Sequence, residues 1–189
     1  MSEASFHERF AAYLARRIEE STRPRAVLRR SLAFPPGTWP ESFPYVEPFV
    51  ATADKWTREA AYLVAGLYAA SGVSAGSGNM GAAAYRLRAR TESDSVEARF
   101  LALLDADEEQ LPHRLRQMVT LMSGQDIAPD WAMLFRDLTR WNDPRRRVQE
   151  NWAREYYRHE SADAADDESQ AIEVGTRTEQ RPNETPVGI

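Results

Sequence analysis

The sequence contains no cysteine, and its 24 basic side chains include a single lysine, Lys55. Without thiols, disulfide bonds and thiolate zinc sites are excluded. No stretch approaches the roughly 18 apolar residues of a membrane span. The first ten residues, MSEASFHERF, also lack the apolar core of a signal peptide. These absences predict a cytoplasmic protein without membrane contact.

Charge is unevenly distributed along the chain. The segment from Glu160 to Ile189 carries eight acidic residues and two arginines, so residues 1–159 hold 22 basic and 21 acidic side chains. The same segment has no aromatic residue and no apolar periodicity, which predicts a disordered acidic tail. Because the remainder is nearly neutral, a basic face on it requires an acidic face elsewhere.

Apolar residues recur at helical spacing along most of residues 5–159, and nowhere do they alternate long enough for a strand. Together with a capping box at Ser5–Glu8 and a cap at Asp54, this predicts an all-α fold. The expected helices span about 5–20, 24–33, 54–70, 82–90, 94–104, 108–122, 131–141 and 144–159. Five prolines between residues 35 and 48 predict an ordered connector. We expect two small helical bundles, residues 1–92 and 93–159, followed by the tail, residues 160–189.

Residues 76–81, GSGNMG, have the G-x-G-x-x-G spacing of dinucleotide-binding loops. That site requires a strand before the glycines and a parallel sheet around them. Here a predicted helix, 54–70, precedes the glycines. The stretch is therefore predicted to be a loop that binds no nucleotide cofactor.

Groupings of residues that could support catalysis are scarce. His7, His113 and His159 fall in three separate predicted helices, and none has a second ligand at metal-binding spacing. The acid pair Glu108/Glu109 lies at a predicted helix start, where the helix dipole favours negative charge. We expect no enzyme activity, no catalytic residue, no metal and no cofactor. A small metal-dependent helical hydrolase is the weaker rival.

Arginines form four groups, and each group alone is explained as the solvated face of a helix. Together, on a chain without catalytic groups, they predict a surface that contacts the nucleic-acid backbone. The candidate contacts are Arg25, Arg29, Arg30, Arg86, Arg88, Arg114, Arg116, Arg145, Arg146 and Arg147. Exposed aromatic residues are too few to predict a base-stacking platform, and Trp131, Trp141 and Trp152 are expected in the core.

The group at residues 145–147 is unusual. Asp143–Pro144 predicts a helix start, and three cations in the first turn of a helix oppose the helix dipole. Either Asp143 and Glu150 offset this cost, or the arginines and the free N–H groups form a seat for a phosphate. The sequence leaves both interpretations open.

Five segments, taken in order, resemble a known family. They are RAVLRRSL (25–32), REAAYLVAGLYA (58–69), NMGAAAYRL (79–87), SVEARFLALLDADEEQLPHRLRQMVTLM (95–122) and DWAMLFRDLTRWNDPRRRVQENWAREYY (130–157). Together they resemble the CasB family, the small subunit of the type I-E CRISPR surveillance complex, Cascade. The similarity covers about residues 1–158 and leaves the acidic tail outside.

The resemblance implies an all-helical subunit without enzymatic activity. It implies as partners the other Cascade subunits, a second copy of the chain, the guide RNA, and the target and displaced DNA strands. Five arginines match the family pattern as candidate contacts with the strands: Arg29, Arg30, Arg86, Arg114 and Arg116. The alternative is a helical adaptor that binds only protein.

Overall fold

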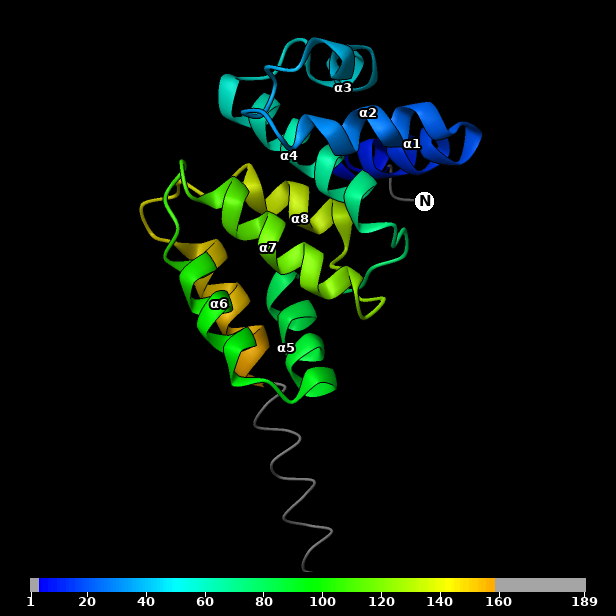
Figure 1. Cartoon of the computed structure of the whole chain (residues 1–189). Coiled ribbons are helices and arrows are strands. Elements are labelled where there is room, and N and C mark those ends of the chain that lie inside the picture. The colour runs from blue at the N-terminus through cyan, green and yellow to red at the C-terminus, as the bar shows by residue number, and fades with distance from the viewer. Residues whose placement is uncertain (1–3, 159–189) are drawn as a thin grey trace, which may run out of the picture.

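The computed structural model describes residues 4–158, and in that range the chain is helical with no strand (Figure 1). Residues 147–158 form the last helix of this range. The predicted all-α fold is confirmed, and the predicted acidic tail, residues 160–189, lies outside the described residues. The preceding elements are α1 (Phe6–Glu20), α2 (Thr22–Ser31), the 3₁₀ turn η1 (Pro40–Ser42), α3 (Phe43–Val50), α4 (Lys55–Ser71), α5 (Met80–Thr91), α6 (Asp94–Leu104), α7 (Leu111–Ser123) and α8 (Trp131–Leu138).

Side-chain caps fix several helix starts where the sequence predicts them. Ser5 Oγ accepts the N–H of Glu8 at 3.3 Å, and Glu8 Oε2 accepts the N–H of Ser5 at 2.6 Å, which completes the capping box before α1. Asp54 Oδ1 accepts the N–H of Thr57 at 3.0 Å at the start of α4. These bonds satisfy N–H groups that have no partner inside the helix.

The predicted connector at residues 35–48 is wrong over its second half, where η1 and α3 form. Pro40 and Pro44 occupy first-turn positions, at which a helix needs no N–H donor. Pro48 lies inside α3, but the helix has only eight residues, and burial of Val46 and Val50 holds it in place. The number of prolines predicts a connector, but two of these prolines lie at positions that a helix tolerates.

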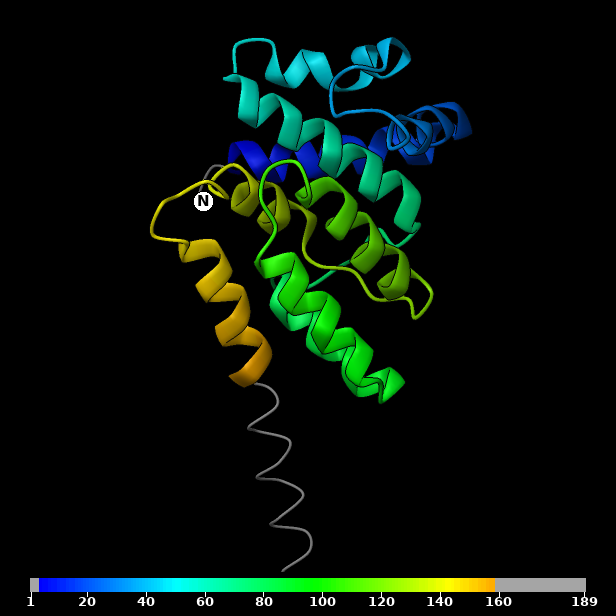
Figure 2. The same ribbon diagram turned by 60° about the vertical axis from the view of Figure 1, so that its left-hand side comes forward.

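The helices are arranged in two layers that share one core. At the top of Figure 1, α2 and α3 pack on α4, and α8, which is drawn below α4, packs on both α1 and α4. In the lower layer, α5, α6 and α7 pack on one another, and α7 also packs on α4. The turned view in Figure 2 shows residues 147–158 running beside α5 and α6. The division into bundles at residue 92 stays a prediction.

Indole N–H groups join segments that are far apart in the sequence. The predicted core residues Trp131, Trp141 and Trp152 are all buried, as expected. Trp131 donates to the Val73 carbonyl at 3.0 Å, and Trp141 donates to the Ala106 carbonyl at 3.1 Å. Each bond gives a buried polar group its partner.

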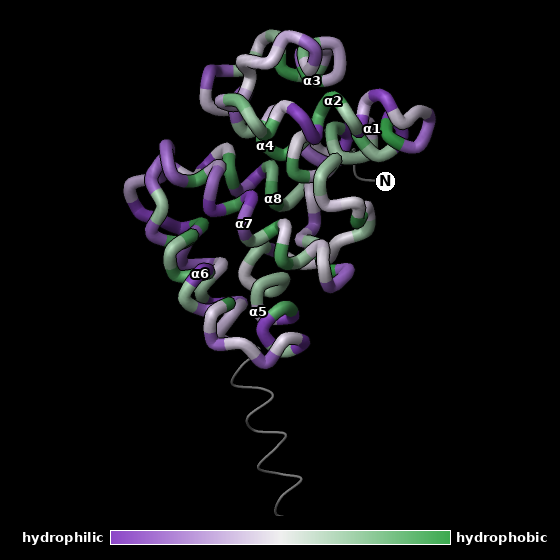
Figure 3. The backbone as a smooth tube through the Cα atoms, in the orientation of Figure 1, coloured by the Kyte–Doolittle hydropathy of each residue, from purple (hydrophilic) through white to green (hydrophobic). Residues whose placement is uncertain are grey.

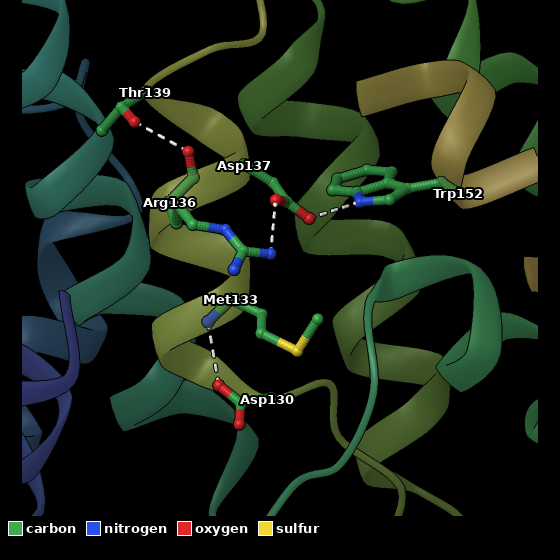
Figure 4. Close-up of polar contacts among 6 residues, drawn as sticks. All are labelled: Asp130, Met133, Arg136, Asp137, Thr139 and Trp152. Carbon is green, nitrogen blue, oxygen red and sulfur yellow. Dashed lines mark hydrogen bonds and ion pairs between the residues drawn. The ribbon is translucent and has the colours of Figure 1, made fainter. Parts of the chain in front are cut away.

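Asp137, on α8, holds the last helix of the described range. Its Oδ2 accepts the Trp152 indole N–H at 2.7 Å, and its Oδ1 accepts from Arg136 Nη2 at 3.3 Å (Figure 4). The start of α8 is itself capped, because Asp130 Oδ1 accepts the N–H of Met133 at 2.8 Å. Residues 147–158 are therefore attached to α8 through one carboxylate.

The glycine stretch forms a loop between α4 and α5 over residues 76–79, as predicted, but α5 begins at Met80 and includes Gly81. The glycines serve close packing. A Cβ on Gly76 would lie 1.9 Å from the Pro129 carbonyl oxygen, and a Cβ on Gly81 would lie 1.9 Å from the Trp152 carbonyl oxygen. Gly78 has φ +66°, which favours glycine. The spacing that resembles a dinucleotide motif therefore lets α5 approach residues 147–158 and the 128–129 segment.

His7 provides a pH-dependent contribution to stability. Its ring packs edge-on against Phe135 at 5.0 Å between centroids, and burial together with Arg136 and Arg140 lowers the pKa of the imidazole below its ordinary value. The pKa of His7 is lower in the folded than in the unfolded state. The stability contributed by neutral His7 is therefore complete above the unfolded pKa and is lost as the pH falls from the unfolded pKa through the folded pKa. We expect the wild type to lose more unfolding free energy between about pH 8 and about pH 5 than the non-titrating variant His7→Gln.

Urea titrations of both proteins across that range would check this expectation. The carboxylates of Glu8, Glu47 and Asp54 have pKa values below their ordinary range, so they remain ionised over the same interval. Parallel pH profiles for the wild type and His7→Gln would contradict the role of His7.

Candidate nucleic-acid interface

Several of the predicted arginines donate to carbonyl groups at helix C-termini. Arg25 Nε bonds the Ala69 carbonyl of α4 at 3.3 Å, and Arg116 Nη1 bonds the Leu32 carbonyl after α2 at 3.2 Å. Arg146 Nη2 bonds the Leu104 carbonyl of α6. The last carbonyls of a helix lack partners within the helix and carry partial negative charge, so a guanidinium group is favourable there. Part of the arginine content is therefore explained by capping.

Arg86 and Arg88 are held by the packing of α5. Arg86 Nη2 donates to the carbonyls of Ser77 and Ala128, at 2.7 and 3.1 Å, and burial lowers the pKa of this guanidinium. Arg88 Nη1 lies 3.8 Å from Glu97 Oε2. Arg86 thus joins the glycine loop to the segment that precedes α8, and its contact with nucleic acid stays a prediction.

The predicted helix start at residue 144 is wrong, because the helix begins at residue 147. Asp143 Oδ1 accepts the N–H of Arg145 at 3.0 Å, which closes a turn, and Arg146 follows with φ +51°. Arg147 Nε lies 3.7 Å from Asp143 Oδ2. Only Arg147 lies within the helix, so three cations do not share its first turn. Phosphate binding by this group stays a prediction.

One outward stripe of α7 faces a pocket beside α6. The pocket has a volume of about 340 Å³ and is lined by Arg99, His113, Arg116, Gln117, Thr120 and Leu121. The α7 residues in this lining follow the pattern i, i+3, i+4, i+7, i+8 (113, 116, 117, 120 and 121), which places them on one face of the helix. No carboxylate is among these lining residues. We call this the arginine pocket. Figure 3 shows hydrophilic residues in the first turns of α7.

A second pocket, of about 410 Å³, adjoins the first and shares His113 and Arg116 with it. It lies between the end of α2 and the start of α7, and we call it the aromatic pocket. Its wall is formed by residues 31–36, Tyr62, Leu63, Glu108, Glu109, Pro112, His113 and Arg116. The two pockets together form the α2–α7 groove.

An aromatic stack stands at the edge of the aromatic pocket. The rings of Phe34 and Trp39 are stacked, with centroids 4.3 Å apart and planes inclined by 14°. The guanidinium carbon of Arg30 lies 5.3 Å from the centroid of Trp39. Phe34 is 38% exposed and lines the pocket. The expectation that exposed aromatic residues are too few for stacking overlooked this arrangement.

The predicted site residues therefore divide into two sets. Arg116 lines the groove, Arg30 stands beside it on Trp39, and Arg29 is exposed next to Arg30 on α2. Arg114 is half-buried on α7. Among the predicted arginines, only Arg116 lines a pocket of the groove. The other nine candidates line neither pocket: Arg25, Arg29, Arg30, Arg86, Arg88, Arg114, Arg145, Arg146 and Arg147.

Sequence reasoning missed Arg99 and Phe34. Arg99 follows Val96 on α6 by three residues, and its Nη1 donates to the Ser95 carbonyl at 3.0 Å. Nothing in the local sequence shows that α6 packs beside α7, which brings Arg99 to Arg116. Phe34 follows α2 in a proline-rich stretch, and only the fold brings it to Pro112 and His113.

Metal-binding groups and membrane-spanning helices are both absent from the described range. Residues 4–158 contain no group of three or more His, Cys, Asp or Glu side chains placed to hold a metal ion. Within the same range, none of the helices has both the length and the apolar character needed to cross a membrane.

Comparison with known proteins gives a consistent set of relatives. Residues 24–157 match the family model described as CRISPR-associated protein Cse2. The chain is 50% identical over 155 residues to CRISPR-associated protein Cse2 of Thermus thermophilus, which covers 79% of this chain and 89% of the relative.

Solved structures agree with these sequence matches. The crystal structure of M. ruber CasB superposes with a TM-score of 0.74 at 40% identity, covering 86% of this chain and 98% of that one. A chain of a CRISPR RNA-guided surveillance complex has the same fold, with a TM-score of 0.69 at 22% identity over 82% of this chain and 94% of that one.

Proposed function

Because the chain belongs to the Cse2 family of CRISPR-associated proteins, we propose that it is the small, non-catalytic subunit of an RNA-guided surveillance complex that opens DNA. In this role the α2–α7 groove holds single-stranded nucleic acid by its phosphates. The partners are other subunits of the complex, a second copy of the chain, the guide RNA, and the target and displaced DNA strands. The likeness to a chain of a surveillance complex supports this assignment at the level of the fold.

The arginine pocket is the observation that carries the proposal. It brings Arg99 of α6 and Arg116 of α7 to one cavity, beside His113 and without a lining carboxylate. Guanidinium groups donate in a planar fork that suits phosphate oxygens. Contacts with phosphates position a strand and carry no base information, so the recognition is independent of sequence.

The mechanism follows from the energetics of strand exchange. An RNA–DNA duplex is about as stable as the DNA duplex that it replaces, so modest protein contacts to the strands decide how far the exchange proceeds. Arg116 is well placed for such contacts, because its bond to the Leu32 carbonyl limits the freedom of its side chain before a strand arrives. A preorganised side chain loses less entropy on binding.

The salt dependence of binding tests the proposal directly. Each phosphate neutralised on a single strand contributes about 0.7 to the slope of log affinity against log salt concentration. We expect Arg99→Gln and Arg116→Gln each to reduce the slope by about 0.7 for a single-stranded oligonucleotide, measured by fluorescence anisotropy starting at low salt.

Arg16→Gln is the matched control, because Arg16 is exposed on α1, pairs with Glu20 and does not line the groove. Its slope should equal that of the wild type. Unchanged slopes in both groove variants, or binding that depends on base sequence, would contradict phosphate holding by the arginine pocket.

A protein-binding adaptor is the second candidate function. It is favoured by the arginines that already bond backbone carbonyls, since these side chains contribute to the fold without any nucleic acid. The two functions differ in what a charge reversal does to the assembled complex.

A further inference from the structure

We propose that the aromatic pocket receives one unstacked nucleobase, which stacks on Phe34 while the adjoining phosphate lies in the arginine pocket. This inference rests on the proposed function and adds a base contact to it. Single-stranded nucleic acid exposes bases as flat apolar surfaces, and every base offers a π-face whatever its sequence. A base contact of this kind is consistent with recognition that does not depend on sequence.

The ring of Phe34 is prepared for stacking. Trp39 covers one of its faces in a nearly parallel arrangement, and Phe34 remains 38% exposed, so its accessible surface lies away from Trp39. Arg30 lies over the Trp39 ring and adds a cation–π contact to the stack. The orientation of Phe34 is therefore set by its neighbours before a ligand binds, which lowers the entropic cost of binding.

The pocket has the size and the wall for a base. Its volume of about 410 Å³ falls within the range of about 300–1,000 Å³ that is typical of small-ligand sites. Pro35, Pro36, Leu63 and Pro112 supply apolar surface around Phe34. A base that enters this pocket exchanges water for apolar and aromatic contacts.

The charges along the α2–α7 groove orient a nucleotide. Glu108 and Glu109 line the aromatic pocket, and their negative charge disfavours a phosphate there. Arg99 lines only the arginine pocket, while Arg116 lines both. The base is therefore directed to the carboxylate end of the groove and the phosphate to the guanidinium end. Because the pockets share Arg116 and His113, one nucleotide can occupy both.

Comparing two oligonucleotides with the same backbone separates the base from the phosphates. One is a single-stranded oligodeoxycytidylate of about twelve nucleotides, and the other is an abasic strand of equal length. We expect the full wild-type chain at low salt to bind the first about fivefold to tenfold more tightly, since one exposed stacking contact lies at the weak end of measured base–aromatic contacts. Phe34→Ala should remove this difference, and Phe34→Tyr should retain it.

Phe43→Ala is the matched control, because Phe43 is 37% exposed and does not line the aromatic pocket. Its preference for the strand with bases should equal that of the wild type, and thermal melting would verify that each variant is folded. Equal binding of the two strands by the wild type would overturn the base pocket and leave phosphate holding intact. A preference that survives in Phe34→Ala would also overturn it. Failure to bind either strand would overturn the proposed function together with this inference.

Discussion

Replacing Gly81 with alanine is expected to lower the free energy of unfolding by about 3 kcal/mol, the upper end of typical overpacking costs. The added Cβ would lie 1.9 Å from the Trp152 carbonyl oxygen and 2.7 Å from its carbonyl carbon. These are backbone atoms, so no side-chain rotation relieves the clash. Trp152 is also fixed by its indole bond to Asp137. The alanine therefore forces α5 and residues 147–158 apart.

The measurement is a urea or thermal denaturation of the full chain. For a chain of this size a loss of about 3 kcal/mol lowers the melting temperature by about 6–12 °C. Gly124→Ala is the matched control, because Gly124 has φ −65° at the end of α7 and its nearest contact would be an ordinary 3.5 Å. That variant should melt close to the wild type. A Gly81→Ala protein as stable as Gly124→Ala would show that the two helices do not meet at this glycine.

Reversing the charge of both groove arginines, Arg99→Glu with Arg116→Glu, is expected to leave assembly of the surveillance complex intact and to shorten the lifetime of the opened DNA at least tenfold. A hydrogen bond to a charged group contributes about 1.5–3 kcal/mol, and about 1.4 kcal/mol is a factor of ten. The glutamates also repel the phosphates that the arginines attract. Charge reversal at Arg29 and Arg30 should also leave assembly intact and shorten the lifetime of the opened DNA.

Two measurements on the reconstituted complex separate the proposals. Size-exclusion chromatography reports whether the variant subunit is incorporated, and the decay of strand opening reports the lifetime. The adaptor alternative expects incorporation to fail, whereas strand holding expects normal incorporation with rapid closure. The control pair is Arg16→Glu with Arg23→Glu, which changes the net charge equally at positions outside the groove. If the control variant shortened the lifetime of the opened DNA equally, the effect would come from net charge alone and strand holding by the groove would be contradicted.

Local features were predicted well because they are encoded within one or two turns. The capping box at Ser5 and Glu8 and the N-cap at Asp54 appear in the structure as hydrogen bonds of the kind expected. The burial of Trp131, Trp141 and Trp152 also follows from helical spacing. Proline content misled the prediction at α3, because the effect of a proline depends on its place in the helix rather than on its number.

The site was predicted less completely, because it depends on which helices become neighbours. Arg116 was identified from its sequence motif, yet its partner in the pocket, Arg99, comes from a different helix. Arg25 and Arg146 were assigned to a surface for strands, and the fold gives both a carbonyl at the end of another helix. A sequence shows that an arginine is present. It does not show whether the guanidinium already donates a hydrogen bond to a backbone carbonyl in the fold.

Arg116 would contact a bound strand and also bonds the Leu32 carbonyl after α2. Binding of a strand in the groove is therefore coupled to the contact between α2 and α7. A guanidinium has five N–H donors, and this bond uses one of them, so a strand can engage Arg116 without displacing it from the carbonyl. Binding and folding then reinforce each other at this residue. An occupied groove should resist separation of α2 from α7, so the subunit becomes stiffer at the place where it holds the strand.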